Sequence, residues 1–202
     1  MLFLNYATIV DPLLRDVRLQ TIEFSGMRAG DRVLDVCCGT GDQAFYYAKA
    51  GIIATGIDSN PNMLKLIRKD KRNQVFGNIA FQLADAQNLP FRDSFFDYTS
   101  ISFALHEKER IVRDEVISEM KRVVKKGGAL IFIDFQAPLP QNLFPYLIKA
   151  IEFIAGREHY RNFNDYIEQG GLNEILKKNQ LAEEKRDCLN DGLIMIVKAR
   201  KP

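Results

Sequence analysis

VLDVCCGTGD, residues 33–42, joins an apolar run to a glycine-containing loop and then to a helical pattern. We predict a buried strand over 32–37 and a helix over 42–49. Gly39, Gly41 and Ala44 match the spacing G-x-G-x-x-A, and Asp58 follows Gly41 by 17 residues, at the end of the next predicted strand. A strand, a glycine loop, a helix, a second strand and a terminal acid, in this order, predict a nucleoside site at the carboxyl edge of a parallel sheet.

The rest of the chain alternates strand-like and helix-like runs, which is typical of an α/β protein. Further strands are predicted at 52–57, 79–83, 96–104 and 129–133. Helices are predicted from Asn60-Pro61, over about 112–124 with closure at 125–128, over 143–155 and over 172–178. A polar loop is predicted over 156–164, and a hairpin over 182–188 and 192–199, turning through Asn190-Asp191-Gly192. The fold class is therefore α/β: a Rossmann-like, doubly wound, mostly parallel sheet with an antiparallel hairpin at its C-terminal end.

Composition narrows the class of protein. The 202 residues suit one domain, and 47% hydrophobic with 27% charged residues is ordinary for a globular chain. A formal charge of +2 gives no electrostatic case for binding nucleic acid. No apolar run reaches transmembrane length, and no signal peptide is recognised at the start. Cys37, Cys38 and Cys188 fit neither a disulfide framework nor a C-x-x-C metal site. We therefore expect a cytoplasmic protein without a metal.

Charge around the glycine loop indicates which nucleoside cofactor binds. The phosphates of a dinucleotide would be repelled by carboxylates, and both Asp35 and Asp42 lie within a few residues of the glycines. The same carboxylates suit the ammonium and sulfonium of S-adenosylmethionine, and no lysine follows the glycines as in a phosphate loop. Asp85, after the strand 79–83, is placed to accept the adenine amino group. An NAD-dependent oxidoreductase stays open as an alternative.

The motifs together resemble class I S-adenosylmethionine-dependent methyltransferases, and within them the ubiquinone/menaquinone biosynthesis group. The matching segments are VLDVCCGTGD, GIDSNPNML, DAQNLPF, FFDYTSISFALHE and MKRVVKKGGALIFIDF. The resemblance covers about residues 30–135 and implies a seven-stranded sheet whose last strand is antiparallel. The pair Cys37-Cys38 departs from the pattern, because many relatives carry a small residue or glycine there.

The resemblance also implies a role for each residue of the site. Asp35 and the loop Gly39-Thr40-Gly41 would hold the methionine end of the cofactor, and Ser102 would lie near it. Asp58 would hold the ribose hydroxyls, and Ser59 is a further expected cofactor-binding residue. The adenine would be contacted by Met63, Asp85 and Ala86.

The acceptor is expected to be small. Methyl transfer needs alignment above all, and a base only if the acceptor must lose a proton. His106 is the candidate base, and His159 is a second histidine that could line an acceptor pocket. Residues 1–27, which include Asn5-Tyr6, and residues 136–173 are predicted as lid or acceptor-binding elements. The apolar helix predicted over 143–155 could serve as a lid, a homodimer interface, a peripheral membrane contact or core.

The function predicted from the sequence is transfer of a methyl group from S-adenosylmethionine to O or C of a small, apolar or aromatic, quinol-like acceptor. S-adenosylhomocysteine would be the product. A non-catalytic cofactor-binding module or partner subunit is the alternative, because no base is obvious.

Overall fold

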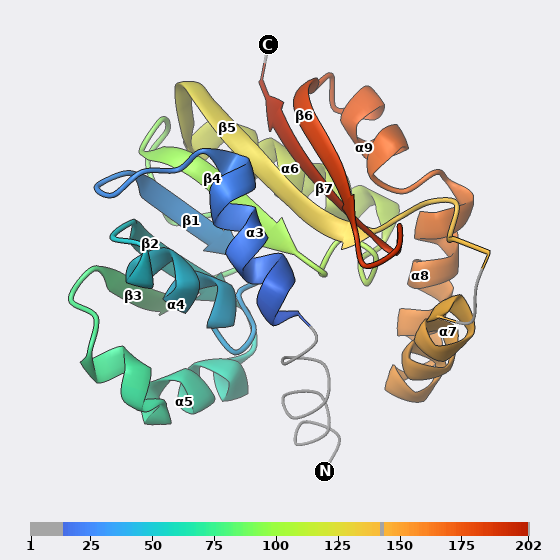
Figure 1. Cartoon of the computed structure of the whole chain (residues 1–202), viewed down its shortest axis with the longest axis horizontal. Helices are drawn as coiled ribbons and strands as arrows, with labels where there is room; N and C mark the ends of the chain where they lie inside the picture. Colours follow the sequence, from blue (N-terminus) through green and yellow to red (C-terminus); the bar gives the residue numbers. More distant parts are fainter. Residues whose placement is uncertain (1–13, 142–143, 202) are drawn as a thin grey trace.

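The computed structural model describes residues 14–141 and 144–201, and it is built on one seven-stranded sheet (Figure 1). The strand order is β3-β2-β1-β4-β5-β7-β6. Strand β7 runs antiparallel to both of its neighbours, whereas the pairings among β3, β2, β1, β4 and β5 are all parallel. The bounds are β1 Arg32–Val36, β2 Ile53–Asp58, β3 Ile79–Leu83, β4 Phe96–Ser102, β5 Val124–Phe135, β6 Ala182–Leu189 and β7 Ile194–Arg200. The predicted fold class is confirmed.

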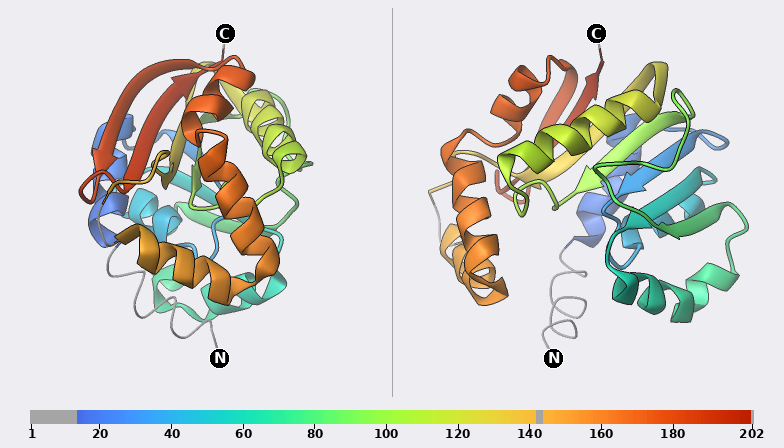
Figure 2. Two further views of the ribbon diagram at one scale, coloured as in Figure 1. Left: turned by 90° about the vertical axis from the view of Figure 1, so that its right-hand side faces the viewer. Right: turned by 180° about the vertical axis from the view of Figure 1, so that it is seen from behind.

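Helices cover both faces of this sheet, as the views from in front and from behind show (Figures 1 and 2). On one face lie α3 (Arg15–Ser25), α4 (Asp42–Lys49) and α5 (Pro61–Lys69), followed by the short 3-10 helix η2 (Lys71–Gln74). On the other face lie α6 (Arg110–Val123) and α9 (Leu172–Lys178). The paired helices α7 (Phe144–Ala155) and α8 (Arg157–Glu168) lie beyond the carboxyl end of β5. This doubly wound arrangement leaves the carboxyl edge of the sheet as the place for a ligand.

Local sequence signals explain several of these boundaries. Helix α5 begins where the side chain of Asn60 accepts a hydrogen bond from the N–H of Asn62 at 2.9 Å, with Pro61 in its first turn. The β6–β7 hairpin turns through three residues with positive φ, which are Asn190, Asp191 and Gly192. These residue types tolerate the left-handed region, so the predicted turn is confirmed.

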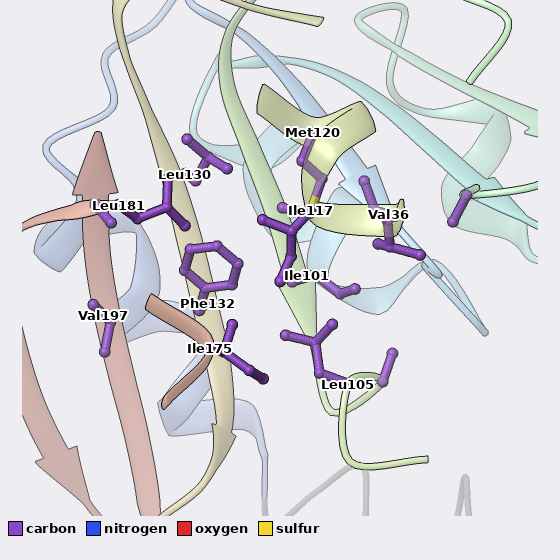
Figure 3. Close-up of a cluster of buried hydrophobic side chains, with 14 of the residues drawn as sticks. Val36, Ile101, Leu105, Ile117, Met120, Leu130, Phe132, Ile175, Leu181 and Val197 are labelled. Atoms are coloured by element: carbon purple, nitrogen blue, oxygen red, sulfur yellow. The ribbon is translucent and has the colours of Figure 1, made fainter. Parts of the chain in front are cut away.

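The largest core cluster fills the space between the sheet and α6 and α9 (Figure 3). Ile117 and Met120 of α6 face Phe132 of β5, and all three are fully buried. Burying side chains of this size contributes about 1.5–3 kcal/mol each, so this layer holds the C-terminal half of the sheet against its helices.

The predicted closure of the long helix at Lys125-Lys126-Gly127-Gly128 is wrong. The chain becomes extended at Val124, and these residues already belong to β5. A side chain at position 128 would meet the carbonyl oxygen of Asp97 at 2.4 Å, and Lys125 Nζ donates to Asp97 Oδ1 at 2.6 Å. The Gly128 signal therefore reflects close pairing of β5 with β4, not a helix end.

The polar loop predicted over 156–164 is also wrong, because residues 157–164 lie within α8 and Gly156 is the residue that precedes the helix. Asn162, Phe163 and Tyr166 recur at helical spacing and are buried. The polar residues that suggested a loop are satisfied by partners elsewhere: Arg161 donates to Glu109, and Asp165 accepts from Arg113 at 3.0 Å.

Helix α7 is present as predicted, although Leu143 and Asn5-Tyr6 lie outside the described residues. Ile148 and Glu152 are buried, whereas Ile151, Phe153 and Ile154 are exposed, the last two by about two thirds. Core packing is therefore excluded for these three, and the roles of lid, interface or membrane contact stay predictions. Within the described ranges, we find no helix with the length and apolar character needed to cross a bilayer.

We predict that Gly56→Ala destabilises the fold by about 1–3 kcal/mol, as overpacking does. The new methyl would lie 2.6 Å from the ring of Phe81, which packs across β2. Gly77→Ala is the matched control, because nothing lies within 4 Å of its added carbon. Urea unfolding of both variants measures the difference, and equal stabilities would contradict this packing.

Candidate functional site

A pocket opens at the carboxyl edge of the sheet, where β1, β2 and β3 end. Its empty space, which is open to solvent, is about 350 Å³. The pocket brings together four residues that the sequence predicted from separate segments: Asp58, Ser59, Asp85 and Ala86. The other lining residues are Cys37, Ile57, Ala84, Gln87, Lys108, Val112 and Val116.

Asp58 fixes the glycine loop at the rim of this pocket. Its Oδ2 accepts from the N–H of Gly39 at 2.9 Å, and its Oδ1 accepts from the N–H of Asn60 at 2.8 Å. Gly39 has a φ of 54°, and a side chain there would meet no atom within 4 Å, so the loop presents bare backbone to open space. Gly41 is needed for a different reason, because its φ is 78° and an added carbon would lie 2.8 Å from Phe81.

The loop that carries Asp85 is held by α6. The N–H of Leu89 donates to Glu119 at 2.7 Å. Arg122 donates to the carbonyl oxygens of Leu89 at 2.9 Å and Phe91 at 2.7 Å. Asp85 itself is exposed and accepts from the N–H of Gln87 at 2.9 Å. A guanidinium that bridges two carbonyls gives the loop after β3 a defined position beside the pocket.

Asp35 is buried in the sheet, on β1 between β2 and β4. It is 1% exposed, and its Oδ1 accepts from the hydroxyl of Ser100 at 2.9 Å. Its Oδ2 has no hydrogen-bond partner. Burial raises the pKa of Asp35 to about 7, although the Ser100 hydrogen bond and the charge of Arg18 lower it. A buried carboxylate oxygen without a partner is costly, and it fits the ammonium of the expected cofactor.

The remaining predicted cofactor residues do not line this pocket. Ser102 ends β4, and its buried hydroxyl also has no partner. Thr40 donates to Asp42 at 3.4 Å. Met63 is half-buried in the first turn of α5.

Asp42 does not supply the free negative charge that the sequence suggested. Its carboxylate pairs with Arg72, and Arg18 Nη1 lies 3.6 Å from it. The Asp42 carboxylate therefore has two arginine partners, although it shares Arg72 with Asp70, and the charge argument for the cofactor rests on Asp35, Asp58 and Asp85.

Two ionisable side chains of the pocket wall, Lys108 and Cys37, had no assigned role in the sequence analysis. Lys108 lines the pocket two residues beyond His106, and the residues of its segment gave no pattern that distinguished it. Cys37 also lines the pocket and has a φ of 57°, where glycine is favoured. Burial raises the pKa of the Cys37 thiol to about 11, so it is a neutral group in the pocket wall.

His106 does not line this pocket and is 2% exposed. Its Nδ1 lies 2.6 Å from Asp134 Oδ1, and its Nε2 lies 3.6 Å from Glu152. Burial by itself would lower the pKa of His106, but Asp134, Glu152 and Glu107 raise it to about 10. His159 lies half-buried on α8, with Nδ1 3.9 Å from Glu107. Within residues 14–141 and 144–201, no cluster of His, Cys, Asp and Glu could hold a metal ion.

The residues present fit an adenosyl cofactor. Asp58 and Asp85 are acceptors for hydroxyl and amino groups around one pocket, and Asp35 and Ser102 offer unpartnered polar atoms on the neighbouring strands. Pyrophosphate would meet carboxylates at each of these positions except Ser102, which disfavours it.

Comparison with known sequences gives three findings. A model of the "ubiE/COQ5 methyltransferase family" matches residues 13–177. The ubiquinone/menaquinone biosynthesis C-methyltransferase UbiE of Pseudomonas putida is 44% identical over 123 residues, which are 58% of this chain and 47% of that protein. The same enzyme of Pseudomonas aeruginosa (strain LESB58) is 42% identical over 138 residues, 66% of this chain and 52% of that protein. The chain thus spans about half the length of the curated relatives it matches.

A solved structure shares the fold. It is a SAM-dependent methyltransferase from Aquifex aeolicus, with a TM-score of 0.65 and 18% identity, covering 90% of this chain and 88% of that one. At this identity, the likeness supports the fold alone.

We predict that the contribution of Asp35 to the free energy of unfolding decreases as the pH rises from 5 to 7.5. Its pKa is above that of the unfolded chain, so the folded protein keeps a proton that the unfolded chain releases. This contribution is fully present below about pH 4, which is the pKa of Asp35 in the unfolded chain. It is lost as the pH rises through the pKa of about 7 in the folded protein. Urea unfolding of the native chain and of Asp35→Asn at each pH isolates this contribution, and parallel curves for the two proteins would contradict it.

Proposed function

The chain belongs to the ubiE/COQ5 methyltransferase family, and from this premise we propose that it is an S-adenosylmethionine-dependent methyltransferase. The observation that carries the proposal is the meeting of Asp58, Ser59, Asp85 and Ala86 in one pocket, beside the unpartnered Oδ2 of Asp35. Three segments that are far apart in the sequence thus present acceptors suited to one adenosyl ligand.

Each residue group has a proposed task. Asp58 binds the ribose hydroxyls while its bonds to Gly39 and Asn60 keep the loop in place. Asp85 accepts the adenine amino group, and Ala86 covers the ring. Asp35 and Ser102 hold the methionine end. When bound, the cofactor would supply a methyl group on a sulfonium, a good leaving group, so alignment accounts for much of the acceleration.

The acceptor is proposed to be a small aromatic compound that is methylated on carbon. The curated relatives are named as C-methyltransferases of ubiquinone and menaquinone biosynthesis, which favours this class. The acceptor would approach from the side of α7 and α8, within the predicted acceptor segment 136–173. On the side of α8, His106 lies among the rings of Phe135 from β5 and of Phe163 and Tyr166 from α8. His106 is the proposed contact to the acceptor.

We expect micromolar binding of S-adenosylmethionine and S-adenosylhomocysteine by calorimetry, and none of NAD. Asp58→Ala should weaken binding of both at least tenfold, because a hydrogen bond to a charged group contributes about 1.5–3 kcal/mol. Asp16→Ala, an exposed change on α3, is the control. Preferential binding of NAD would contradict the proposal. Since Asp58 also holds the loop, the thermal midpoint of each variant is measured alongside.

Binding of S-adenosylmethionine should also release protons near neutral pH. The ammonium favours the ionised form of Asp35, whose pKa in the free protein is about 7. Affinity should therefore rise between about pH 6 and 7, before the α-amino group of the cofactor, with an ordinary pKa of about 7.7–8.0, loses much of its charge. Calorimetry in two buffers of different ionisation enthalpy counts the protons. Asp35→Asn should remove the release, and an unchanged count in that variant would show that another group is responsible.

A further inference from the structure

His106 is held on one side by a fixed carboxylate. Its Nδ1 lies 2.6 Å from Oδ1 of Asp134, which is 1% exposed. Asp134 also accepts from the backbone N–H groups of Phe135 at 2.8 Å, Leu105 at 3.2 Å and His106 itself at 3.3 Å. A carboxylate with these partners cannot turn away, so it orients the imidazole and directs Nε2 toward the opposite side.

On the opposite side the contacts are longer. Nε2 lies 3.6 Å from Oε1 of Glu152 and 3.9 Å from Oε1 of Glu107. Both distances exceed that of a hydrogen bond with good geometry. For the Glu152 carboxylate, His106 is the one ion-pair partner among the residues that the structure describes. The imidazole therefore has one tightly bound carboxylate and one loosely bound carboxylate.

Glu152 belongs to α7, a helix with few buried side chains in its described part. Within the described part of α7, Ile148 and Glu152 are the buried side chains, whereas Ile151, Phe153 and Ile154 are exposed. The contacts of α7 are chiefly with α8. Withdrawal of Glu152 from His106 would thus disturb little packing in the sheet.

The surroundings of His106 favour the charged imidazole. The charged groups that face it are Asp134 from β5, Glu152 from α7 and Glu107 from its own segment, and they outweigh the effect of burial. His159 of α8 faces Glu107, and Arg113 of α6 donates to the carbonyl oxygen of Leu105. If Glu152 leaves, the imidazolium keeps Asp134 at Nδ1, but its buried Nε2–H loses the nearer of the two carboxylates on that side, so an anion placed there would restore the charge of the site.

We propose that Glu152 occupies, in the resting enzyme, the position that an ionised oxygen of the methyl acceptor takes during the reaction. This inference rests on the proposed function and narrows it. The acceptor is an aromatic compound with an ionisable hydroxyl group, bound as its anion with the oxygen on Nε2 of His106. Replacement of one anion by another keeps the charge of the buried site constant, whereas a neutral acceptor would remove one negative charge from the site and leave Asp134 as the one close carboxylate partner of the imidazolium among the described residues.

The proposed role of His106 differs from that of a general base. A protonated imidazole cannot accept a proton, but it stabilises a phenolate and so favours ionisation of the acceptor hydroxyl. The acceptor hydroxyl gives its proton to the solvent before the anion binds, and ionisation places electron density on the ring carbons next to the oxygen. One of these carbons would take the methyl group as the bond between that group and the sulfonium sulfur breaks, and the proton on that carbon would then leave to the solvent, which restores the aromatic ring. His106 is a catalytic residue in this scheme because it touches the acceptor, and Asp134 is its positioning residue.

Two matched compounds test this exchange, in which the anion of the acceptor replaces the Glu152 carboxylate at Nε2 of His106. 4-Nitro-1-naphthol is ionised and coloured at pH 8, and its methyl ether has a similar shape but no charge. With S-adenosylhomocysteine present, the native protein should bind the naphtholate at least tenfold more tightly than the ether. Glu152→Gln should bind the naphtholate a further several-fold more tightly, because the internal competitor loses its charge, with no change for the ether. Glu158→Gln, an exposed change on α8, should match the native protein.

The outcomes separate this inference from the proposed function. If S-adenosylhomocysteine does not bind, the proposed function fails. If it binds but the naphtholate and the ether bind equally, or the naphtholate binds to neither the native protein nor Glu152→Gln, the exchange is wrong.

A second measurement needs no variant and no acceptor. Nitrogen chemical shifts of His106 in the native protein should show an imidazolium at pH 8. A neutral imidazole at that pH would overturn the proposal even if the naphtholate binds.

Discussion

The carboxylate of Asp58 links two turns that would otherwise be independent. One oxygen accepts from Gly39 in the loop after β1, and the other accepts from Asn60 at the start of α5. The ends of β1 and β2 are therefore held together at the edge where parallel strands leave room for a ligand. Asp85 reaches the same edge because β3 pairs with β2 in a register that places Leu83 beside Asp58. The pocket depends on this shared edge.

Most of the sheet was predictable from the sequence, because burial and turn chemistry act locally. Helices α4 and α9 and strand β3 have the predicted bounds, and the Asn-Asp-Gly turn identified the hairpin. The errors came from non-local contacts. Gly128 resembles a helix stop, but it is required by the carbonyl of Asp97 on the adjacent strand. Helix α8 resembles a loop because its polar side chains find partners such as Glu109 in a distant segment.

The site was predictable to the same extent. Asp58 ends β2 and Asp85 lies in the loop just after β3, so strand order brings them to one pocket. Asp42 is also acidic and close in sequence, but Arg72 pairs with it from beyond α5, a contact that spacing cannot indicate. Lys108 lines the pocket because of the path of the irregular segment after β4. Glu152 lies near His106 because of the position of α7. Such contacts depend on packing between elements and leave no periodic signal in the chain.

A crystal structure of the chain with S-adenosylhomocysteine tests the central claim most directly, namely that the edge organised by Asp58 is the cofactor site. The ribose hydroxyls should lie within hydrogen-bond distance of Asp58, and the adenine should lie beside Asp85 and Ala86. The α-ammonium of the homocysteine part should lie at Oδ2 of Asp35. Asp58 should keep its bonds to Gly39 and Asn60. A nucleoside bound elsewhere on the protein, or turned so that its ribose lies away from Asp58, would contradict the claim.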